Sequence, residues 1–371
     1  MNIAEFKLER YFAKYEFTTR YLLSCSDCDG YPLSYVLDQA TTKERNLWDK
    51  LTLGYTESEG NIHLREAISD QYTSISPSEI VVASPGELNF ILMNRLLHTG
   101  DHVICMSPAY QSLFEVARSL GTELSFWQPN PDNWHFDPDE LAALIRPNTR
   151  MIIINFPHNP TGAFPSRDEL DRIVDLARRQ GIYLFSDEMY RSLLHGETEE
   201  IPSVCDLYEK GISLWGMAKT FGLAGLRMGW LACKDTQILQ QILAFKDYLS
   251  ICNSAPSEIL SLIALRHQDA FVQPNLTKIR KNLSLFQAFV RKHESWIQCI
   301  PSQAGSTAFA KLHISESSLD FGERLVRETG IMLVPAEMFE YGQAHIRIGF
   351  GRENFSEVLT VFGQWLLKQS K

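Results

Sequence analysis

The stretch "WGMAKTFGLAGLRMGW" (residues 215–230) places one lysine, Lys219, among small and apolar residues, with Arg227 eight positions later. In a partly apolar pocket close to a second cation, a lysine keeps more of its amine neutral. A neutral amine is a nucleophile that forms a Schiff base with an aldehyde. A lysine that only reaches the surface along its aliphatic stem would explain neither the neighbouring glycines nor the arginine. We therefore predict covalent carbonyl chemistry at Lys219.

Two turn-forming motifs follow β-rich runs of the sequence. Gly86 follows the run 80–84 and opens a helix, and a glycine at a helix N-terminus presents free backbone N–H groups to an anion. Asn159, in "PHNPTGAF", follows the run 151–156, and Pro160 keeps it out of helical geometry. Taken singly, each motif is also compatible with an ordinary turn that binds nothing.

A carboxylate and a phenol stand near the end of another apolar run. Asp187 and Tyr190 belong to "SDEMYRS", directly after residues 183–185. A carboxylate buried at that point needs a cationic partner. Ligands of open α/β sheets bind beyond the carboxyl ends of the strands. We therefore expect one edge of a sheet to collect five residues: Gly86, Asn159, Asp187, Tyr190 and Lys219.

The elements that position these residues are short apolar runs alternating with amphipathic helical stretches. This alternation predicts an α/β fold with a mainly parallel sheet covered by helices. After residue 255 the pattern changes to a long helix reaching about residue 293, followed by shorter mixed elements. We predict a large domain over residues 45–270 and a smaller α+β domain formed by residues 1–44 and 271–371. The seven expected strands of the large domain are residues 80–84, 102–107, 123–127, 151–156, 183–187, 213–217 and 228–233.

The composition of the 371-residue chain is that of a globular protein, with 44% hydrophobic and 22% charged residues. Its net charge of −10 argues against nucleic acid or an anionic membrane as a partner. The sequence contains no run of about 18 uncharged apolar residues. Its seven cysteines fit reduced thiols, so we expect a cytoplasmic location. Cys25 and Cys28 form a CxxC pair without a second CxxC or a nearby histidine, which disfavours a metal or redox site.

Together these motifs resemble those of the pyridoxal-phosphate-dependent aminotransferases of class I and II, which have the aspartate-aminotransferase type of fold, fold type I. The resemblance rests on "GYTESEGNIHLREAI", "SPAY", "NFPHNPTG", "SDEMY", "MAKTFGLAGLRMGW" and "IRIGF", in the family's order. It implies that pyridoxal 5′-phosphate is the cofactor, bound to Lys219 as a Schiff base. It also implies that Lys219 moves a proton at the substrate's α-carbon and that Asp187 pairs with the pyridine nitrogen.

The same resemblance implies further contacts to the cofactor ring and to the substrate. Tyr190 and Asn159 would hydrogen-bond the phenolic oxygen of the cofactor, and Tyr110 would stack on its ring. Arg347, in "HIRIGF", would clamp the α-carboxylate of the substrate. Without the resemblance, Arg347 would be interpreted as a surface arginine on a strand.

The phosphate of the cofactor would rest on backbone N–H groups and on one guanidinium. The resemblance assigns the N–H groups to Gly86, Glu87 and Leu88, and the guanidinium to Arg227. Tyr55 would reach the phosphate from the neighbouring subunit, which implies a homodimer with shared active sites.

Three residues depart from the common pattern of the family. Gly216 and Ala218 stand where hydroxyl residues are frequent, so two contacts to the phosphate or the lysine are missing. Glu87 stands where a small residue is usual, and a carboxylate aimed at a phosphate would repel it. We therefore predict that the Glu87 side chain turns away from the phosphate.

The expected activity is transamination between an L-amino acid and a 2-keto acid. A closer resemblance, in "RYFAKYEF", the serine-containing loop after it, "NFPHNP", "KDYLS" and "RIGF", is to the subgroup that includes the cyclase capreomycidine synthase. Elimination, replacement or cyclisation with the same cofactor is therefore the alternative. A cofactor-binding regulatory protein is a weaker one, because no helix-turn-helix precedes the family-like region. The segment "GLAGLRMG" lacks G-x-G-x-x-G spacing, which argues against a nicotinamide dehydrogenase.

The pocket for the substrate's side chain is expected around residues 24–31, near Tyr110 and next to the neighbouring subunit's loop before Tyr55. No arginine stands out as a clamp for a second carboxylate, which disfavours a dedicated dicarboxylate enzyme. Arg20, Arg65 and Arg191 are the possible exceptions.

Overall fold

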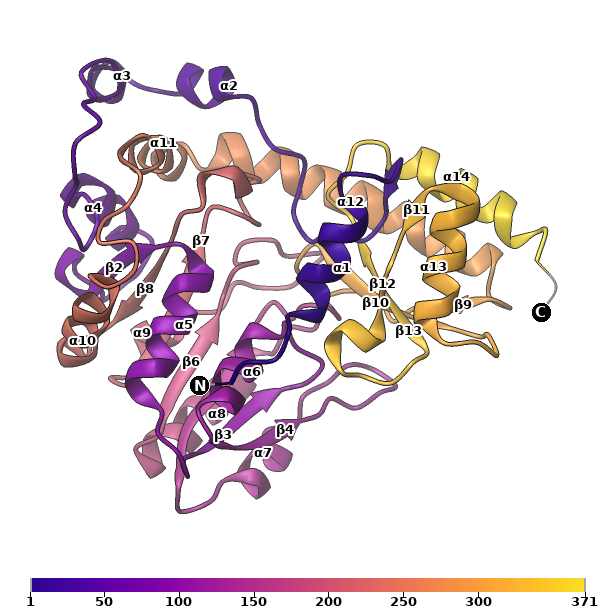
Figure 1. Ribbon diagram of the computed structural model, residues 1–371, viewed down its shortest axis with the longest axis horizontal. Coiled ribbons are helices and arrows are strands. Elements are labelled where there is room, and N and C mark those ends of the chain that lie inside the picture. Colours follow the sequence, from indigo (N-terminus) through magenta and orange to yellow (C-terminus); the bar gives the residue numbers. More distant parts are fainter. Residues whose placement is uncertain (1, 370–371) are drawn as a thin grey trace.

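A seven-stranded sheet is the largest element of the computed structural model, which describes residues 2–369 (Figure 1). Strand β8 runs antiparallel to both of its neighbours, and every other neighbouring pair in this sheet is parallel. The predicted α/β fold with a mainly parallel seven-stranded sheet is therefore confirmed. In spatial order the strands are β2 (Ile80–Ala83), β8 (Gly229–Cys233), β7 (Gly211–Gly216), β6 (Tyr183–Asp187), β5 (Thr149–Asn155), β3 (His102–Met106) and β4 (Glu123–Trp127).

Helices cover both faces of this sheet, as strands that are apolar along their whole length require. Helix α8 (Arg167–Gln180) illustrates the local signals. It begins with a capping box between Ser166 and Glu169, and it ends at Gly181 in the left-handed conformation. The helices are α4 (Ile62–Ser69), α5 (Pro85–Leu96), α6 (Ser112–Ser119), α7 (Pro138–Leu144), α8 (Arg167–Gln180), α9 (Val204–Leu207), α10 (Thr236–Lys246) and α11 (Ala255–Arg266), with the 3-10 helices η1 (Pro77–Glu79) and η2 (Ala224–Leu226).

A smaller antiparallel sheet follows in the second part of the chain, at the right of Figure 1. The expected single helix up to residue 293 is in fact two helices, because His267 leaves helical geometry after α11. None of the helices described between residues 2 and 369 is long and apolar enough to cross a membrane. The sheet contains β12 (Val334–Pro335), β13 (His345–Gly349), β10 (Thr307–Leu312) and β9 (Ile297–Gln298), with α12 (Asp269–Lys292), α13 (Ser318–Thr329), α14 (Phe355–Leu366) and the 3-10 helix η3 (Ala336–Phe339).

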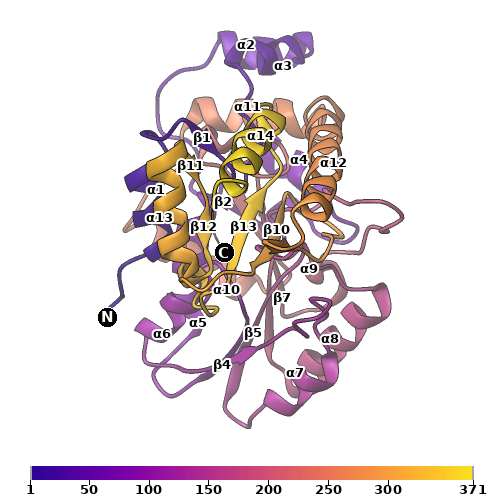
Figure 2. The ribbon, with the colours of Figure 1, turned by 90° about the vertical axis from the view of Figure 1, so that its right-hand side faces the viewer.

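The N-terminal segment joins the two sheets. Helix α1 (Lys7–Tyr15) buries Phe12 in one hydrophobic cluster with Ile154 of the large sheet and Met332 of the small part. Strand β1 (Tyr21–Leu22) pairs in parallel with β11 (Ile331–Met332). Helices α2 (Leu33–Asp38) and α3 (Thr42–Asp49) then lie beside α11 at the top of the molecule (Figures 1 and 2). The boundaries proposed for the two domains stay a prediction.

A close approach of three strand ends fixes the edge of the sheet that carries the predicted site. Pro85, at the start of α5, packs against two glycines. A Cβ on Gly229 would lie 2.6 Å from Pro85 Cγ, and a Cβ on Gly216 would lie 2.8 Å from the Cα of Gly229. Position 216 therefore has no room for a hydroxyl-bearing side chain. The glycine that departs from the family pattern is required by this packing.

Candidate active site

A cavity of about 450 Å³ lies at the carboxyl edge of the large sheet. Its walls come from the strand ends, from the N-terminal segment and from β13. Three of the predicted site residues, Tyr55, Glu87 and Leu88, do not line it. The predicted residues that the fold brings together there are Gly86, Tyr110, Asn159, Asp187, Tyr190, Lys219, Arg227 and Arg347.

Lys219 lies in the loop after β7 and is half-buried. Its Nζ donates a hydrogen bond to Ser26 Oγ over 2.8 Å. The next residue, Thr220, is fully buried, and its hydroxyl donates to the carbonyl oxygens of Met189 and Arg191, at 3.2 and 2.7 Å. The loop that carries the lysine is thereby tied to the turn that follows Asp187.

Asp187 ends β6 as a buried carboxylate with little to neutralise it. Its Oδ1 accepts one hydrogen bond, from the backbone N–H of Met189 at 3.1 Å. Among residues 2–369, no cationic side chain forms an ion pair with it. Burial, together with the charge of Glu188, raises the pKa of Asp187 to about 6. A positively charged group placed against this carboxylate would restore its ionised form.

Arg347 lies on β13 and is 1% exposed, so the interpretation of it as a surface arginine is wrong. Strand β13 is buried because it pairs with both β10 and β12. Arg347 Nε and Nη2 donate to the carbonyl oxygen of Ser24, at 3.1 and 2.9 Å, and Nη1 donates to Asn159 Oδ1 at 3.2 Å. Burial lowers the pKa of Arg347, but an arginine stays charged. A buried guanidinium with no carboxylate partner among the described residues suits a carboxylate ligand.

The N-terminus of α5 also lines the cavity, with Pro85 and Gly86. A Cβ built on Gly86 would meet no atom within 4 Å, so this turn is open toward the cavity. The N–H groups of Gly86 and Glu87 have no acceptor within the helix. The N–H of Leu88 donates to the carbonyl oxygen of Ser84 at 3.0 Å, and its contact with a phosphate stays a prediction. The Glu87 carboxylate accepts from Ser250 Oγ at 2.7 Å, outside the cavity, in agreement with the predicted orientation.

A family model described as "Aminotransferase class I and II" matches residues 22–360 of the chain. The chain belongs to this aminotransferase family. Capreomycidine synthase of Streptomyces vinaceus is 30% identical to it over 349 residues, which cover 92% of this chain and 88% of that protein. Aspartate aminotransferase of Pyrococcus horikoshii is 27% identical over 310 residues, covering 80% of this chain and 78% of that one. A solved PLP-dependent aminotransferase from Streptococcus suis 89-1591 has a TM-score of 0.93, with 29% identity and 100% of both chains covered.

These comparisons confirm the family, fold type I and the cofactor pyridoxal 5′-phosphate. The aminotransferase cavity offers a suitable group for each charged part of this cofactor. Asp187 lacks a cation, which a protonated pyridine nitrogen would supply. The open turn at Gly86 and the guanidinium of Arg227 lie on the same cavity and suit a phosphate.

Several polar residues of the aminotransferase cavity were not singled out from the sequence. Asn155, at the end of β5, donates from Nδ2 to the carbonyl oxygen of Asp187 at 2.8 Å, and its strand-end position was the signal that could have identified it. Ser26 and Asp27 come from the loop expected to form the side-chain pocket. Glu9 and Glu16 come from the region of α1, where nothing in the sequence indicated a place near the lysine.

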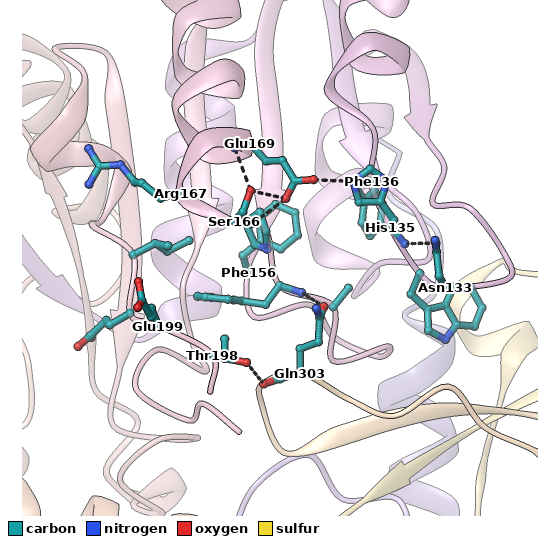
Figure 3. Close-up of a pocket in the computed structure, with 16 residues that line it drawn as sticks. Asn133, His135, Phe136, Phe156, Ser166, Arg167, Glu169, Thr198, Glu199 and Gln303 are labelled. Atoms are coloured by element: carbon teal, nitrogen blue, oxygen red, sulfur yellow. Dashed lines mark hydrogen bonds and ion pairs between the residues drawn. The ribbon is translucent and has the colours of Figure 1, made fainter. Parts of the chain in front are cut away.

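A second and larger cavity, of about 570 Å³, lies elsewhere in the aminotransferase structure and contains none of the predicted site residues. Figure 3 shows that polar groups of this cavity bond to one another. Glu169 accepts from Ser166 Oγ and bonds to His135, and Thr198 Oγ1 donates to the backbone carbonyl oxygen of Gln303. Because these groups are already satisfied, the smaller cavity with its unpaired charges is the better candidate for the active site.

The CxxC pair lies in the loop next to the active-site cavity. Cys25 and Cys28 are both buried and free. Burial raises the pKa of the Cys25 thiol and raises that of Cys28 to about 12. Thiols in this state pack as small apolar side chains and are poor nucleophiles.

Proposed function

We propose that this aminotransferase-family enzyme transfers an amino group from an L-amino acid to a 2-keto acid, with Lys219 as the Schiff-base lysine. The observation that carries the proposal is the meeting of Lys219, Asp187 and Arg347 on one cavity. A nucleophilic amine, a carboxylate without a cation and a cation without a carboxylate are the three groups that such a reaction requires of the protein.

Each of these residues has a defined task in the proposed reaction. Pyridoxal 5′-phosphate, when bound, supplies an aldehyde and a ring that accepts the electrons of a broken bond at the α-carbon. Arg347 binds the α-carboxylate of the substrate and so fixes which bond at the α-carbon faces Lys219. Lys219, released by the substrate, takes up the proton from the α-carbon and delivers it to C4′ of the cofactor. Asp187 keeps the pyridine nitrogen protonated.

The carboxylates of the N-terminal segment suggest the class of amino acid. Glu9, Glu16 and Asp27 all line the cavity. Asp27 is paired with Arg352 at 3.1 Å, whereas no ion pair involves Glu16 among residues 2–369. Burial, and after it the charge of Asp27, raises the pKa of Glu16, so a cation placed beside this carboxyl would favour its ionised form. We propose a substrate with a cationic side chain, which would neutralise these carboxylates. None of the three arginines considered as a second carboxylate clamp, Arg20, Arg65 and Arg191, lines this cavity.

A second candidate is a cyclisation or elimination that begins from the same bound amino acid. It is favoured by the 30% identity to capreomycidine synthase over 92% of this chain. Both candidates need Lys219, Asp187 and Arg347, so the site residues alone do not separate them. The products do: only transamination leaves a keto acid and the amino form of the cofactor.

The test is a panel of L-arginine, L-ornithine, L-citrulline and L-glutamate mixed with the purified holoenzyme. We expect L-arginine or L-ornithine to convert the cofactor to its amino form, seen in the visible spectrum, and 2-oxoglutarate to restore it. Citrulline has nearly the shape of arginine without its charge, so Glu16→Gln should lower the arginine-to-citrulline preference by about five- to ten-fold. Glu5→Gln, an exposed change in the same segment, is the matched control. Substrate consumed without keto acid would favour the second candidate, and an unchanged preference in Glu16→Gln would contradict the cationic side chain.

The proposed partner is a second copy of the chain. Tyr55 is 89% exposed, and the apolar side chain of Leu53 beside it is exposed too. A second segment, residues 248–251, exposes Tyr248, Leu249 and Ile251. The two segments are joined where Ser58 Oγ donates to the carbonyl oxygen of Ile251 at 2.8 Å. Exposed apolar side chains gathered in this way mark an interaction surface. Light scattering should give twice the 42.4 kDa mass of the chain. Tyr248→Glu together with Leu53→Glu should reduce the measured mass to that of a single chain. A wild-type monomer at micromolar concentration would contradict the proposed dimer.

A further inference from the structure

The hydroxyl of Ser26 is the only side-chain hydrogen-bond partner of the Lys219 amine within the described residues. The two groups lie 2.8 Å apart, although they are 193 positions apart in the sequence. Ser26 is 8% exposed and lines the cavity with Lys219. The contact therefore forms inside the active-site cavity.

The loop that presents Ser26 is held in place at several points. Ser306 Oγ donates to the carbonyl oxygen of Ser26 at 2.5 Å, and Arg347 donates to the carbonyl oxygen of Ser24. The loop also lies flat against the end of β13. A Cβ on Gly349 would lie 1.8 Å from the carbonyl oxygen of Cys25, and a Cβ on Gly351 would lie 2.3 Å from that of Asp27. Only glycines allow this approach, so the position of Ser26 is fixed by the fold.

In the proposed reaction, the amine of Lys219 is set free when the substrate displaces it from the cofactor. A long flexible side chain must then be held near the α-carbon, which costs conformational entropy. Hydroxyls at positions 216 and 218, frequent in the family, are absent, and Gly216 has no room for one.

We infer that Ser26 is a positioning residue that holds the released amine of Lys219 beside the reacting carbon. Its hydroxyl accepts the hydrogen bond from Nζ, and it takes the place of the hydroxyls missing near the lysine. The inference rests on the proposed role of Lys219 as the proton carrier. It does not require that the reaction be a transamination, because cyclisation and elimination also begin with removal of the α-proton.

The experiment measures exchange of the α-proton of L-arginine with solvent in D₂O by ¹H NMR, using holoenzyme and no keto acid. We expect Ser26→Ala to slow the exchange by about ten- to a hundred-fold, the effect of losing one hydrogen bond to an amine that becomes charged as it takes up the proton. Ser26→Cys keeps the size of the side chain but offers a weaker acceptor, so it should be slowed similarly. Ser26→Thr keeps the hydroxyl and should stay within a few-fold of the wild type.

Three further readouts separate positioning from a general structural effect. KM for the amino acid and the dissociation constant for the cofactor should stay near the wild-type values in Ser26→Ala, and the α-deuterium isotope effect on kcat should rise. Ser34→Ala, the same change at an exposed serine of this segment, should behave as the wild type.

Wild-type exchange in Ser26→Ala and Ser26→Cys, or equally slow exchange in Ser26→Thr, would overturn the inference. No exchange in the wild type with any amino acid of the panel would overturn both this inference and the role of Lys219. Exchange that depends on Ser26 without formation of a keto acid would support the inference and contradict transamination alone.

Discussion

Lys219→Ala is expected to lower turnover by about 10⁴-fold or more, because it removes both the Schiff-base amine and the proton carrier. No other lysine lines the cavity within the described residues, so no neighbouring amine can replace it. The loop should survive the change, since Thr220 rather than Lys219 ties it to the turn after Asp187. The measurement is keto-acid formation from the best amino acid of the panel.

A covalent readout complements the rate. Treating the holoenzyme with borohydride should attach the reduced cofactor irreversibly to Lys219, found by peptide mass mapping. Lys281→Ala, at an exposed position on α12, is the control and should retain the label and the activity. A label on another lysine, or turnover by Lys219→Ala close to that of the wild type, would disprove the assigned role.

Asp187→Asn is expected to have opposite effects on activity and on the stability of the protein without cofactor. Activity should fall by about a hundred-fold, because a neutral amide no longer holds the proton on the pyridine nitrogen. The cofactor-free protein should become more stable at pH 8, because the substitution removes a buried carboxylate that has no cation.

The direction of the pH dependence follows from the pKa of Asp187, raised from 3.8 to about 6. Stability linked to the protonated carboxyl is present below pH 4 and is lost as the pH rises through 6. The shift corresponds to about 3 kcal/mol at pH 8. Thermal unfolding of the cofactor-free proteins should therefore show the variant above the wild type at pH 8 and equal to it near pH 4. Added cofactor should stabilise the wild type more than the variant; equal unfolding midpoints of the cofactor-free proteins at pH 8 would contradict an uncompensated carboxylate.

Periodicity was enough to predict the sheet. All seven predicted strands lie within two residues of the observed bounds; the largest differences are at β5 (Thr149–Asn155) and β7 (Gly211–Gly216), which each begin two residues before the predicted range. Because carboxyl ends of parallel strands meet at one edge, strand-end reasoning also placed Gly86, Asn159, Asp187 and Lys219 near one another. It could not foresee the break between α11 and α12, since a non-helical His267 leaves no clear pattern in the sequence.

What the sequence determined by itself is the set of residues carried by the strand ends, together with the family and its cofactor, because these depend on local order along the chain. Only the tertiary structure decided which of them are free to act. It showed Arg347 buried against the carbonyl oxygen of Ser24, the Leu88 N–H already occupied, and Ser26 on the lysine. The first and third of these contacts join residues 323 and 193 positions apart. No local pattern specifies such pairs; they form only when the packed sheets and the N-terminal segment come together around one cavity.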